Sequence, residues 1–260
     1  MDRARIEAAA EIIAAARREG RLLEPLPETS RPRSLAEGYE VQNVFRQIWP
    51  DTVAGWKIGA TSPVTMERFG VNEPVYGPFF AGDVHTSPAT PSAGVLRHIA
   101  IETEFAYRLG TDLPPRAAPY SREEVVAAVD ALIPAFEIIS PRFARIPFDD
   151  VASAAADCML NSAMILGAPV SDWHGIDVPR HPVQLRIDGL VTGEGTGAEC
   201  LGDPRKVLDW VIEKLRAGGI GLHKGQILST GTCTGIVPLQ KGQRAIGDFG
   251  PLGKVEVQFT

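Results

Sequence analysis

One segment of this chain, residues 99–109, places two glutamates inside a largely apolar run, Ile-Ala-Ile-Glu-Thr-Glu-Phe-Ala-Tyr-Arg-Leu. The run has the pattern of a buried strand, on which side chains two residues apart share a face. Glu102 and Glu104 therefore share a face, with their Cα atoms roughly 7 Å apart. Two neighbouring carboxylates in a buried strand are costly unless a cation or a shared proton offsets them. The segment predicts a site for a hard divalent cation, which prefers oxygen ligands, or else the solvated outer face of an edge strand.

Two further charged residues occupy apolar segments. Glu137 lies in the run Ala-Phe-Glu-Ile-Ile, and an acidic residue in such a strand is rarely buried alone. A neighbouring strand that brings Glu137 beside Glu102 and Glu104 would complete an open Mg²⁺ or Mn²⁺ site; the alternative is an exposed glutamate on an edge strand. Lys57, in Gly-Trp-Lys-Ile-Gly, is expected to be partly desolvated. Desolvation would lower its pKa towards values useful for proton transfer, unless the side chain simply reaches solvent.

Composition excludes several classes of protein. The chain has 260 residues and a formal net charge of -6, with acidic and basic residues interspersed, so no basic stripe for nucleic acid is present. No apolar run approaches the roughly 20 residues of a membrane span, and the N-terminal segment lacks the apolar core of a signal peptide. The three cysteines are far apart and form no C-x-x-C motif, so neither disulfides nor a zinc site are predicted. We expect a cytoplasmic protein.

The first part of the chain predicts two helices. Apolar residues at helical spacing indicate a helix from about Arg3 to Arg18. Ser34-Leu-Ala-Glu37 is a capping-box signature for a second helix, which Pro50 should end. We therefore expect residues 1–50 to form an N-terminal helical appendage and residues 51–260 to form a β-rich catalytic domain.

The remaining chain mixes strands, hairpins and a few helices. Because strands outnumber helices and hairpins mix with crossovers, the expected fold class is α+β with a large mixed sheet. The expected elements include a helix from Ser121 that stops before Pro134, a buried Ala-rich helix over Val151–Leu166, a hairpin at Asp188-Gly189, and a helix from Asp203-Pro204 to Ala217.

Two loops carry further candidates for the site. Asp83 follows Pro-Phe-Phe-Ala-Gly and is either a second acid or base or a turn-forming aspartate. Thr232 belongs to the small polar segment Leu228–Gly235, whose N–H and hydroxyl groups could hold a carboxylate, although a tight turn explains it nearly as well. Gly-Glu-Gly-Thr-Gly at 193–197 is not a dinucleotide fingerprint, because it opens no predicted helix.

Four segments together resemble one branch of a known superfamily. They are Gly-Trp-Lys-Ile-Gly-Ala-Thr-Ser (55–62), Ile-Glu-Thr-Glu-Phe-Ala-Tyr-Arg-Leu (101–109), Ala-Phe-Glu-Ile-Ile (135–139) and Gly-Asp-Phe-Gly-Pro-Leu-Gly-Lys-Val-Glu-Val-Gln-Phe (247–259). In this order they resemble the 2-keto-4-pentenoate hydratase and 4-oxalocrotonate decarboxylase branch of the fumarylacetoacetate hydrolase superfamily. The combination is specific, although each piece alone is not.

The resemblance implies a mixed β-roll with N-terminal helices, assembled as a homo-oligomer. It also implies a Mg²⁺ or Mn²⁺ ion at the positions of Glu102, Glu104 and Glu137, and an active-site lysine at Lys57. Asp83 lies near the position of an acidic residue of the family's site, and the local alignment places the two within one residue of each other.

Two departures from the family pattern lie near its pocket. The family's Asp-Ser-Arg run here reads Ser140-Pro141-Arg142, and its Ala-Asp-Asn-x-Ser helix reads Ala-Asp-Cys-Met-Leu-Asn, ending at Asn161. Arg142 and Asn161 in these segments, and Thr232 in the polar segment described above, are candidate contacts to the substrate, although a structural salt bridge explains Arg142 as well.

The resemblance implies a metal-dependent lyase for short 2-oxo or 2-hydroxydienoate acids, with Lys57 and Asp83 moving protons. We rank hydration of a 2-hydroxy-2,4-dienoate to a 4-hydroxy-2-oxo acid first. Decarboxylation of the 4-oxalocrotonate type is second and acylpyruvate-type C–C hydrolysis third, because no clear His–Glu pair for a hydrolase is visible. A non-catalytic scaffold that pairs with a catalytic relative is the alternative from another class.

Overall fold

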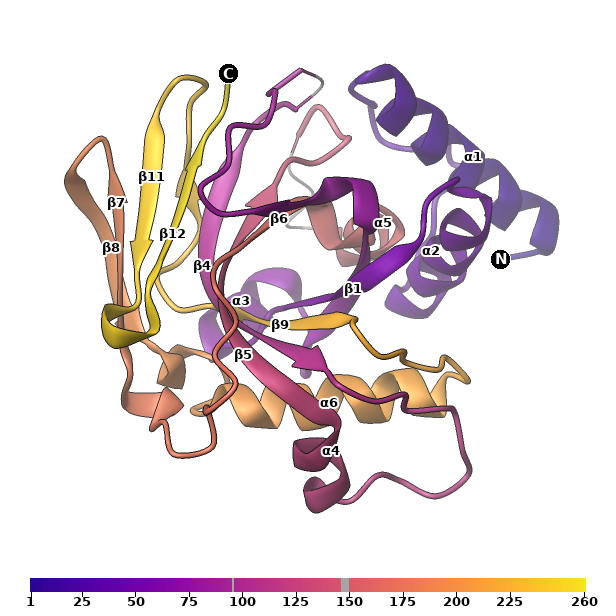
Figure 1. The fold of residues 1–260 in the computed structure, drawn as a ribbon. Helices are drawn as coiled ribbons and strands as arrows, with labels where there is room; N and C mark the ends of the chain where they lie inside the picture. The colour runs from indigo at the N-terminus through magenta and orange to yellow at the C-terminus, as the bar shows by residue number, and fades with distance from the viewer. Residues whose placement is uncertain (95, 146–149) are drawn as a thin grey trace.

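A large mixed sheet forms the centre of the protein (Figure 1). The computed structural model describes residues 1–94, 96–145 and 150–260. In the described chain the main sheet has eight strands in the order β2-β1-β9-β4-β5-β6-β3, with β10 paired to β4. They are β1 (Val53–Gly59), β2 (Val75–Phe80), β3 (Val84–Thr86), β4 (Ala100–Leu109), β5 (Val129–Ile139), β6 (Asn161–Leu166), β9 (Ile227–Thr232) and β10 (Val237–Pro238).

A smaller antiparallel sheet packs beside the first. Its order is β12-β11-β7-β8, and the predicted Asp188-Gly189 turn joins β7 to β8. The four strands are β7 (Pro182–Ile187), β8 (Leu190–Thr196), β11 (Arg244–Asp248) and β12 (Lys254–Gln258). In Figure 1 this sheet stands at one side of the main sheet and the N-terminal helices at the other. The predicted class, α+β with a mixed β-roll, is confirmed.

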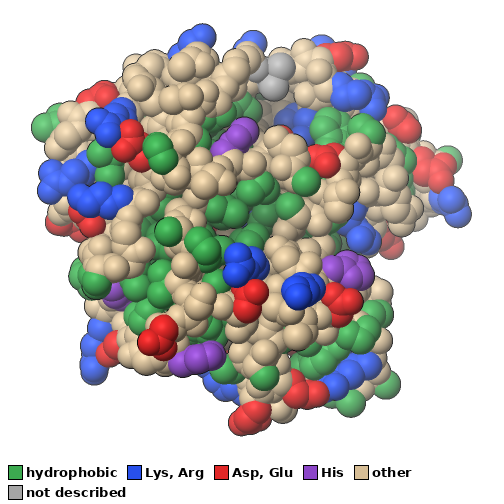
Figure 2. All heavy atoms as spheres, viewed as in Figure 1, with side chains coloured by type: hydrophobic (Ala, Val, Ile, Leu, Met, Phe, Trp, Pro, Cys, Tyr) green, Lys and Arg blue, Asp and Glu red, His purple; other side chains and the backbone are tan. Residues whose placement is uncertain are grey.

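Six α-helices are described around the sheets. They are α1 (Arg3–Glu19), α2 (Leu35–Ile48), α3 (Pro63–Phe69), α4 (Arg122–Ala128), α5 (Val151–Ala156) and α6 (Pro204–Ala217). The α6 helix, predicted from its Asp-Pro start, buries a stripe of apolar residues and packs along β9. In the space-filling view, hydrophobic side chains gather near the centre of this face, with charged side chains beside them and around the margin (Figure 2).

The two N-terminal helices form as predicted and pack on one another. The apolar side chains of α1 and α2, among them Ile13 and Phe45, share one buried cluster with Phe80 of β2 and Phe143. The division into residues 1–50 and 51–260 stays a prediction. No helix in the described ranges is long and apolar enough to cross a membrane.

Two of the predicted helices are shorter than expected. The helix after Ser121 ends at Ala128, and β5 already begins at Val129, because this apolar run pairs with β4 along its whole length. The helix from Val151 ends at Ala156, after which the chain turns through a short 3-10 segment, η2 (Cys158–Leu160), and enters β6. Helical periodicity could not separate an Ala-rich helix from a buried strand over Asn161–Leu166.

Candidate active site

Three glutamates meet at the centre of the main sheet. Glu102 lies on β4 directly opposite Glu137 of β5 in the antiparallel register, and Glu104 follows two residues along the same face. Each carboxylate offers an oxygen, and these oxygens all lie within 4.8 Å of one another. Glu102 is 6% exposed and the other two are fully buried, so the edge-strand alternatives for all three residues are wrong.

Lys57 reaches the same point from β1. Its Nζ lies 3.1 Å from Glu137 Oε1 and donates a hydrogen bond of 3.1 Å to the carbonyl oxygen of Met159. The side chain is buried, so it does not extend into solvent as a surface lysine would. The triad therefore has one ammonium group for three carboxylates.

Burial and like charge shift the pKa values in this cluster. Burial, together with the charge of Glu137, raises the pKa of Glu102 to about 8 and raises that of Glu104 well above its usual range. Burial acts to lower the pKa of Lys57, but attraction to the three glutamates outweighs it, and the net shift is upward. The sequence-based prediction of a lowered Lys57 pKa is therefore wrong for the protein without a metal, because it considered burial alone.

The free carboxylate oxygens fit a hard divalent cation. Asn161 Nδ2 donates to Glu137 Oε1 at 2.9 Å, and the Gly231 amide donates to Glu104 Oε2 at 3.2 Å. The second oxygen of each carboxylate, Glu137 Oε2 and Glu104 Oε1, is buried without a hydrogen-bond partner in the described part of the chain. Buried carboxylate oxygens without donors match the oxygen ligands that a hard divalent cation prefers.

The Gly231 amide can approach Glu104 because this position has no side chain. Gly231 has a φ of +91°, and a Cβ there would lie 2.2 Å from Thr61 Oγ1. Any other residue would clash with Thr61 and strain the backbone at the point where its amide meets Glu104. Thr232, next in the chain, lines the cavity described below, and its hydroxyl donates to the Gly235 carbonyl at 2.9 Å.

The bend that carries the Met159 carbonyl was not foreseen from the sequence. Cys158, Met159 and Leu160 have φ values of 51°, 51° and 67°, in the left-handed region that non-glycine residues rarely adopt. None of the three is a glycine, asparagine or aspartate, the residues that usually signal this conformation. The local sequence thus contains no ordinary signal for the bend.

A cavity of about 520 Å³ opens beside Lys57 and Glu102. Its wall is mainly apolar, with Ile58, Phe69, Ile139, Leu160 and Ile236 among the lining residues. Lys57 is the only cation among the described residues that line it, and the acidic side chains Glu194 and Glu199 stand at the exposed part of the wall. We call this space the carboxylate cavity.

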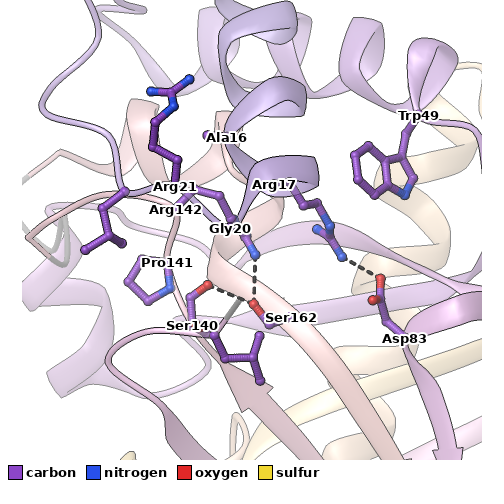
Figure 3. Close-up of a pocket in the computed structure, with 12 residues that line it drawn as sticks. Ala16, Arg17, Gly20, Arg21, Trp49, Asp83, Ser140, Pro141, Arg142 and Ser162 are labelled. Atoms are coloured by element: carbon purple, nitrogen blue, oxygen red, sulfur yellow. Dashed lines mark hydrogen bonds and ion pairs between the residues drawn. The ribbon is translucent and has the colours of Figure 1, made fainter. Parts of the chain in front are cut away.

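Asp83 and Arg142 line a different cavity, of about 130 Å³, between α1 and the main sheet (Figure 3). Asp83 accepts a hydrogen bond of 2.5 Å from Arg17, and neither residue lines the carboxylate cavity. Arg142 pairs with Asp157, so the salt bridge that the sequence left open for it is present. Figure 3 shows its guanidinium directed at Ser162. We call this second space the arginine cavity.

The fold and the site together define a mixed β-roll protein with a buried carboxylate triad and an adjoining lysine. A 2-keto-4-pentenoate hydratase of Paraburkholderia xenovorans (strain LB400) is 29% identical over 262 residues, covering 97% of this chain and 94% of the relative. A 4-oxalocrotonate decarboxylase of Pseudomonas putida is 28% identical over 232 residues, covering 87% and 86%. No family model matches the chain.

The same relationship holds in three dimensions. The structure of 4-oxalocrotonate decarboxylase from Pseudomonas putida G7, complexed with magnesium and adipate, has a TM-score of 0.91 to this protein at 26% identity. The match covers 100% of this chain and 99% of that one. Over nearly its full length the chain is thus similar to proteins of the 2-keto-4-pentenoate hydratase and 4-oxalocrotonate decarboxylase branch of the fumarylacetoacetate hydrolase superfamily, the resemblance that its motifs predicted.

Proposed function

We propose that this protein is a divalent-metal-dependent hydratase, a lyase that adds water to a 2-hydroxy-2,4-dienoate and forms a 4-hydroxy-2-oxo acid. One observation carries the proposal: a buried carboxylate triad and Lys57 adjoin a mainly apolar cavity that has no second cation among its described lining residues. The named relatives include hydratases of this type.

In this proposal Glu102, Glu104 and Glu137 hold the metal, Mg²⁺ or Mn²⁺. When bound, the ion would supply Lewis-acid stabilisation for negative charge on the substrate's carboxylate and C2 oxygen. The carboxylates reach the sheet centre on adjacent strands, so the ligand set is rigid. Asn161 holds Glu137 in place from β6 and leaves its other oxygen free.

Lys57 is the proton carrier of the proposed reaction. The dienol loses the proton of its C2 oxygen and gains one at the far carbon of the diene, which produces a conjugated ketone. Water then adds across the remaining double bond, with its oxygen at C4 and a proton at C3. Lys57 Nζ is buried beside the triad and adjoins the cavity, so it is placed to move protons between the substrate atoms there.

The charge of the cavity wall favours a hydratase over a decarboxylase. A decarboxylase of 4-oxalocrotonate needs room for a second carboxylate at the distal end of the substrate. Arg142 was the sequence-based candidate to bind such a group, but its guanidinium is occupied by Asp157, Asn161 and Ser162. Glu194 and Glu199 would repel a second anion at the exposed wall. An apolar substrate tail fits this wall better.

Decarboxylation remains the second candidate, because the solved relative complexed with adipate has a closely similar fold. Acylpyruvate-type hydrolysis has less support, since no histidine is among the described residues lining the cavity. A non-catalytic scaffold has no need for the buried carboxylates and lysine that this chain retains. Asp83 as a second acid or base, the homo-oligomer and the cytoplasmic location stay predictions.

Proton NMR on freshly generated 2-hydroxypenta-2,4-dienoate and 2-hydroxymuconate tests the proposal, with Mg²⁺, with Mn²⁺ and with EDTA. We expect metal-dependent formation of a 4-hydroxy-2-oxo acid from the monocarboxylate. Loss of CO₂ from the dicarboxylate as the main reaction would favour the decarboxylase. No change in either substrate would leave the hydrolase and scaffold hypotheses to be tested.

A further inference from the structure

The left-handed bend at Cys158–Leu160 supports both Lys57 and Glu137. The Met159 carbonyl accepts the hydrogen bond from Lys57 Nζ, and Asn161, the first residue after the bend, donates its side-chain amide to Glu137. Three consecutive non-glycine residues in the left-handed region are unfavourable for the backbone, because each Cβ crowds the following carbonyl oxygen. A bend of this kind persists only where surrounding contacts determine it.

Arg142 contacts the backbone on both sides of this bend. Its Nη2 donates to the Asp157 carbonyl at 3.0 Å, immediately before the bend, and its Nη1 donates to the Asn161 carbonyl at 2.8 Å, immediately after it. One planar guanidinium therefore fixes the separation of the two ends. Arg142 and Asp157 are 7% and 1% exposed, so solvent competes little for these bonds.

Asp157 fixes Arg142 in return. Its carboxylate accepts one hydrogen bond from Arg142 Nε and a second, of 2.9 Å, from the Arg142 backbone amide. The contact to Nε orients the guanidinium, and the contact to the backbone amide holds the main chain of Arg142. Gly77 of β2 packs against the bend so closely that a Cβ there would lie 2.3 Å from the Cys158 carbonyl oxygen. The bend is thus enclosed from a second direction.

We propose that Arg142 and Asp157 are positioning residues that hold the Cys158–Leu160 bend and thereby place Lys57 and Glu137 for metal binding and proton transfer. Neither residue touches the substrate in this proposal, which rests on the metal site of the proposed function. It replaces the sequence-based assignment of Arg142 to the substrate. The pair acts through two backbone carbonyls, and its effect reaches the triad through Met159 and Asn161.

Metal affinity, measured by calorimetric titration of Mg²⁺ and Mn²⁺ into the full chain, is the main test. Asp157→Asn keeps the size of the side chain but removes the ion pair, and we expect metal binding to weaken about 10- to 100-fold, as for other residues that orient metal ligands. Asp209→Asn is the matched control, because Asp209 pairs with Arg122 on the surface and lies outside both cavities. We expect it to leave metal affinity unchanged.

A second pair of variants separates positioning from general loss of stability. In the Asp157→Asn background, Cys158→Gly lowers the cost of the left-handed conformation, whereas Cys158→Ala removes nearly as much side chain without lowering it. We expect the glycine variant to regain metal affinity and the alanine variant to stay weak. If Asp157→Asn does not fold, Arg142→Lys provides the same test, because an ammonium cannot donate to both carbonyls in the fork geometry.

Three outcomes would overturn the proposal. If Asp157→Asn binds metal like the wild type while Glu104→Gln does not, the positioning role fails and the metal site stands. If Asp157→Asn combined with Cys158→Gly binds metal no better than Asp157→Asn combined with Cys158→Ala, the bend does not carry the influence of Asp157 to the metal site. If Glu104→Gln also keeps full metal affinity, the metal site itself fails, and the positioning role fails with it.

Discussion

The carboxylate cavity and the arginine cavity both bury charge, but they balance it differently. At the arginine cavity each guanidinium has its own anion: Arg17 pairs with Asp83, and Arg142 pairs with Asp157, which lies behind the cavity wall. Beside the carboxylate cavity the three glutamates of the triad share one lysine, and two of their oxygens lack any hydrogen-bond partner in the described chain. Balanced pairs let a fold bury charge without a ligand, whereas an unbalanced cluster of carboxylates fits a bound cation.

The largest effect should come from removing one carboxylate of the triad. Glu104→Gln should abolish turnover and weaken Mg²⁺ binding by more than about 100-fold, since a direct ligand matters more than the residues that orient it. The same change should stabilise the metal-free protein at pH 7, because burial and the neighbouring carboxylates raise the pKa of Glu104 in the folded state, and a glutamine has no ionised form to disfavour there.

Calorimetry and urea denaturation in EDTA measure the two effects of Glu104→Gln. Glu124→Gln, which alters an exposed glutamate paired with Arg116, is the control and should change neither metal binding nor turnover. Undiminished turnover of Glu104→Gln would refute the triad as the metal site.

Removing the only cation among the described residues of the carboxylate cavity should separate metal binding from chemistry. Lys57→Ala should slow turnover by about 100- to 10,000-fold, the usual contribution of a positioned acid or base. Metal affinity should stay the same or increase, because an ammonium that competes for the carboxylates is gone. Steady-state kinetics and metal titration on the same preparation test this, and a wild-type turnover rate would remove Lys57 from the mechanism.

The metal-free protein should lose stability as the pH rises. Glu102 has a folded-state pKa of about 8, above its ordinary value of 4.5, because burial and Glu137 oppose its ionisation. The folded state therefore holds this proton more tightly, and the stabilisation is present below about pH 4.5 and lost as the pH rises through about 8. Urea denaturation at pH 5.5, 7.0 and 8.5 in EDTA measures the slope, which saturating Mg²⁺ should reduce. A metal-free stability that rises over this range would contradict the charge imbalance.

The smallest effect on catalysis should come from the arginine cavity. Asp83→Asn removes the partner of Arg17, whose guanidinium lies over the Trp49 ring, and should lower the free energy of unfolding by about 1–3 kcal/mol. Turnover at saturating metal should change by less than about 10-fold, because Asp83 lies outside the carboxylate cavity. If turnover instead slows by about 100-fold or more while stability stays normal, the result supports the sequence-based role of Asp83 in proton transfer.

Much of the architecture could be predicted because its signals are local. The capped helices α1, α2 and α6, the Asp-Gly hairpin and the paired faces of Glu102 and Glu104 follow from spacing within a few residues. Local spacing failed at α5 and β6, where an Ala-rich run is compatible with a helix and with a buried strand. It also missed α3, a short helix within a stretch rich in glycine and proline.

The sequence by itself determined that three glutamates and one lysine stand in apolar segments and need a common explanation. Only the tertiary structure decided that β5 sets Glu137 opposite Glu102, that β1 carries Lys57 to the same point, and that Asp83 lies in another cavity. The left-handed bend at Cys158–Leu160 was also decided there, because its own residues do not favour it and Arg142 holds it from a distant strand end. Local propensities are read within a few residues, whereas charge balance depends on which strands become neighbours.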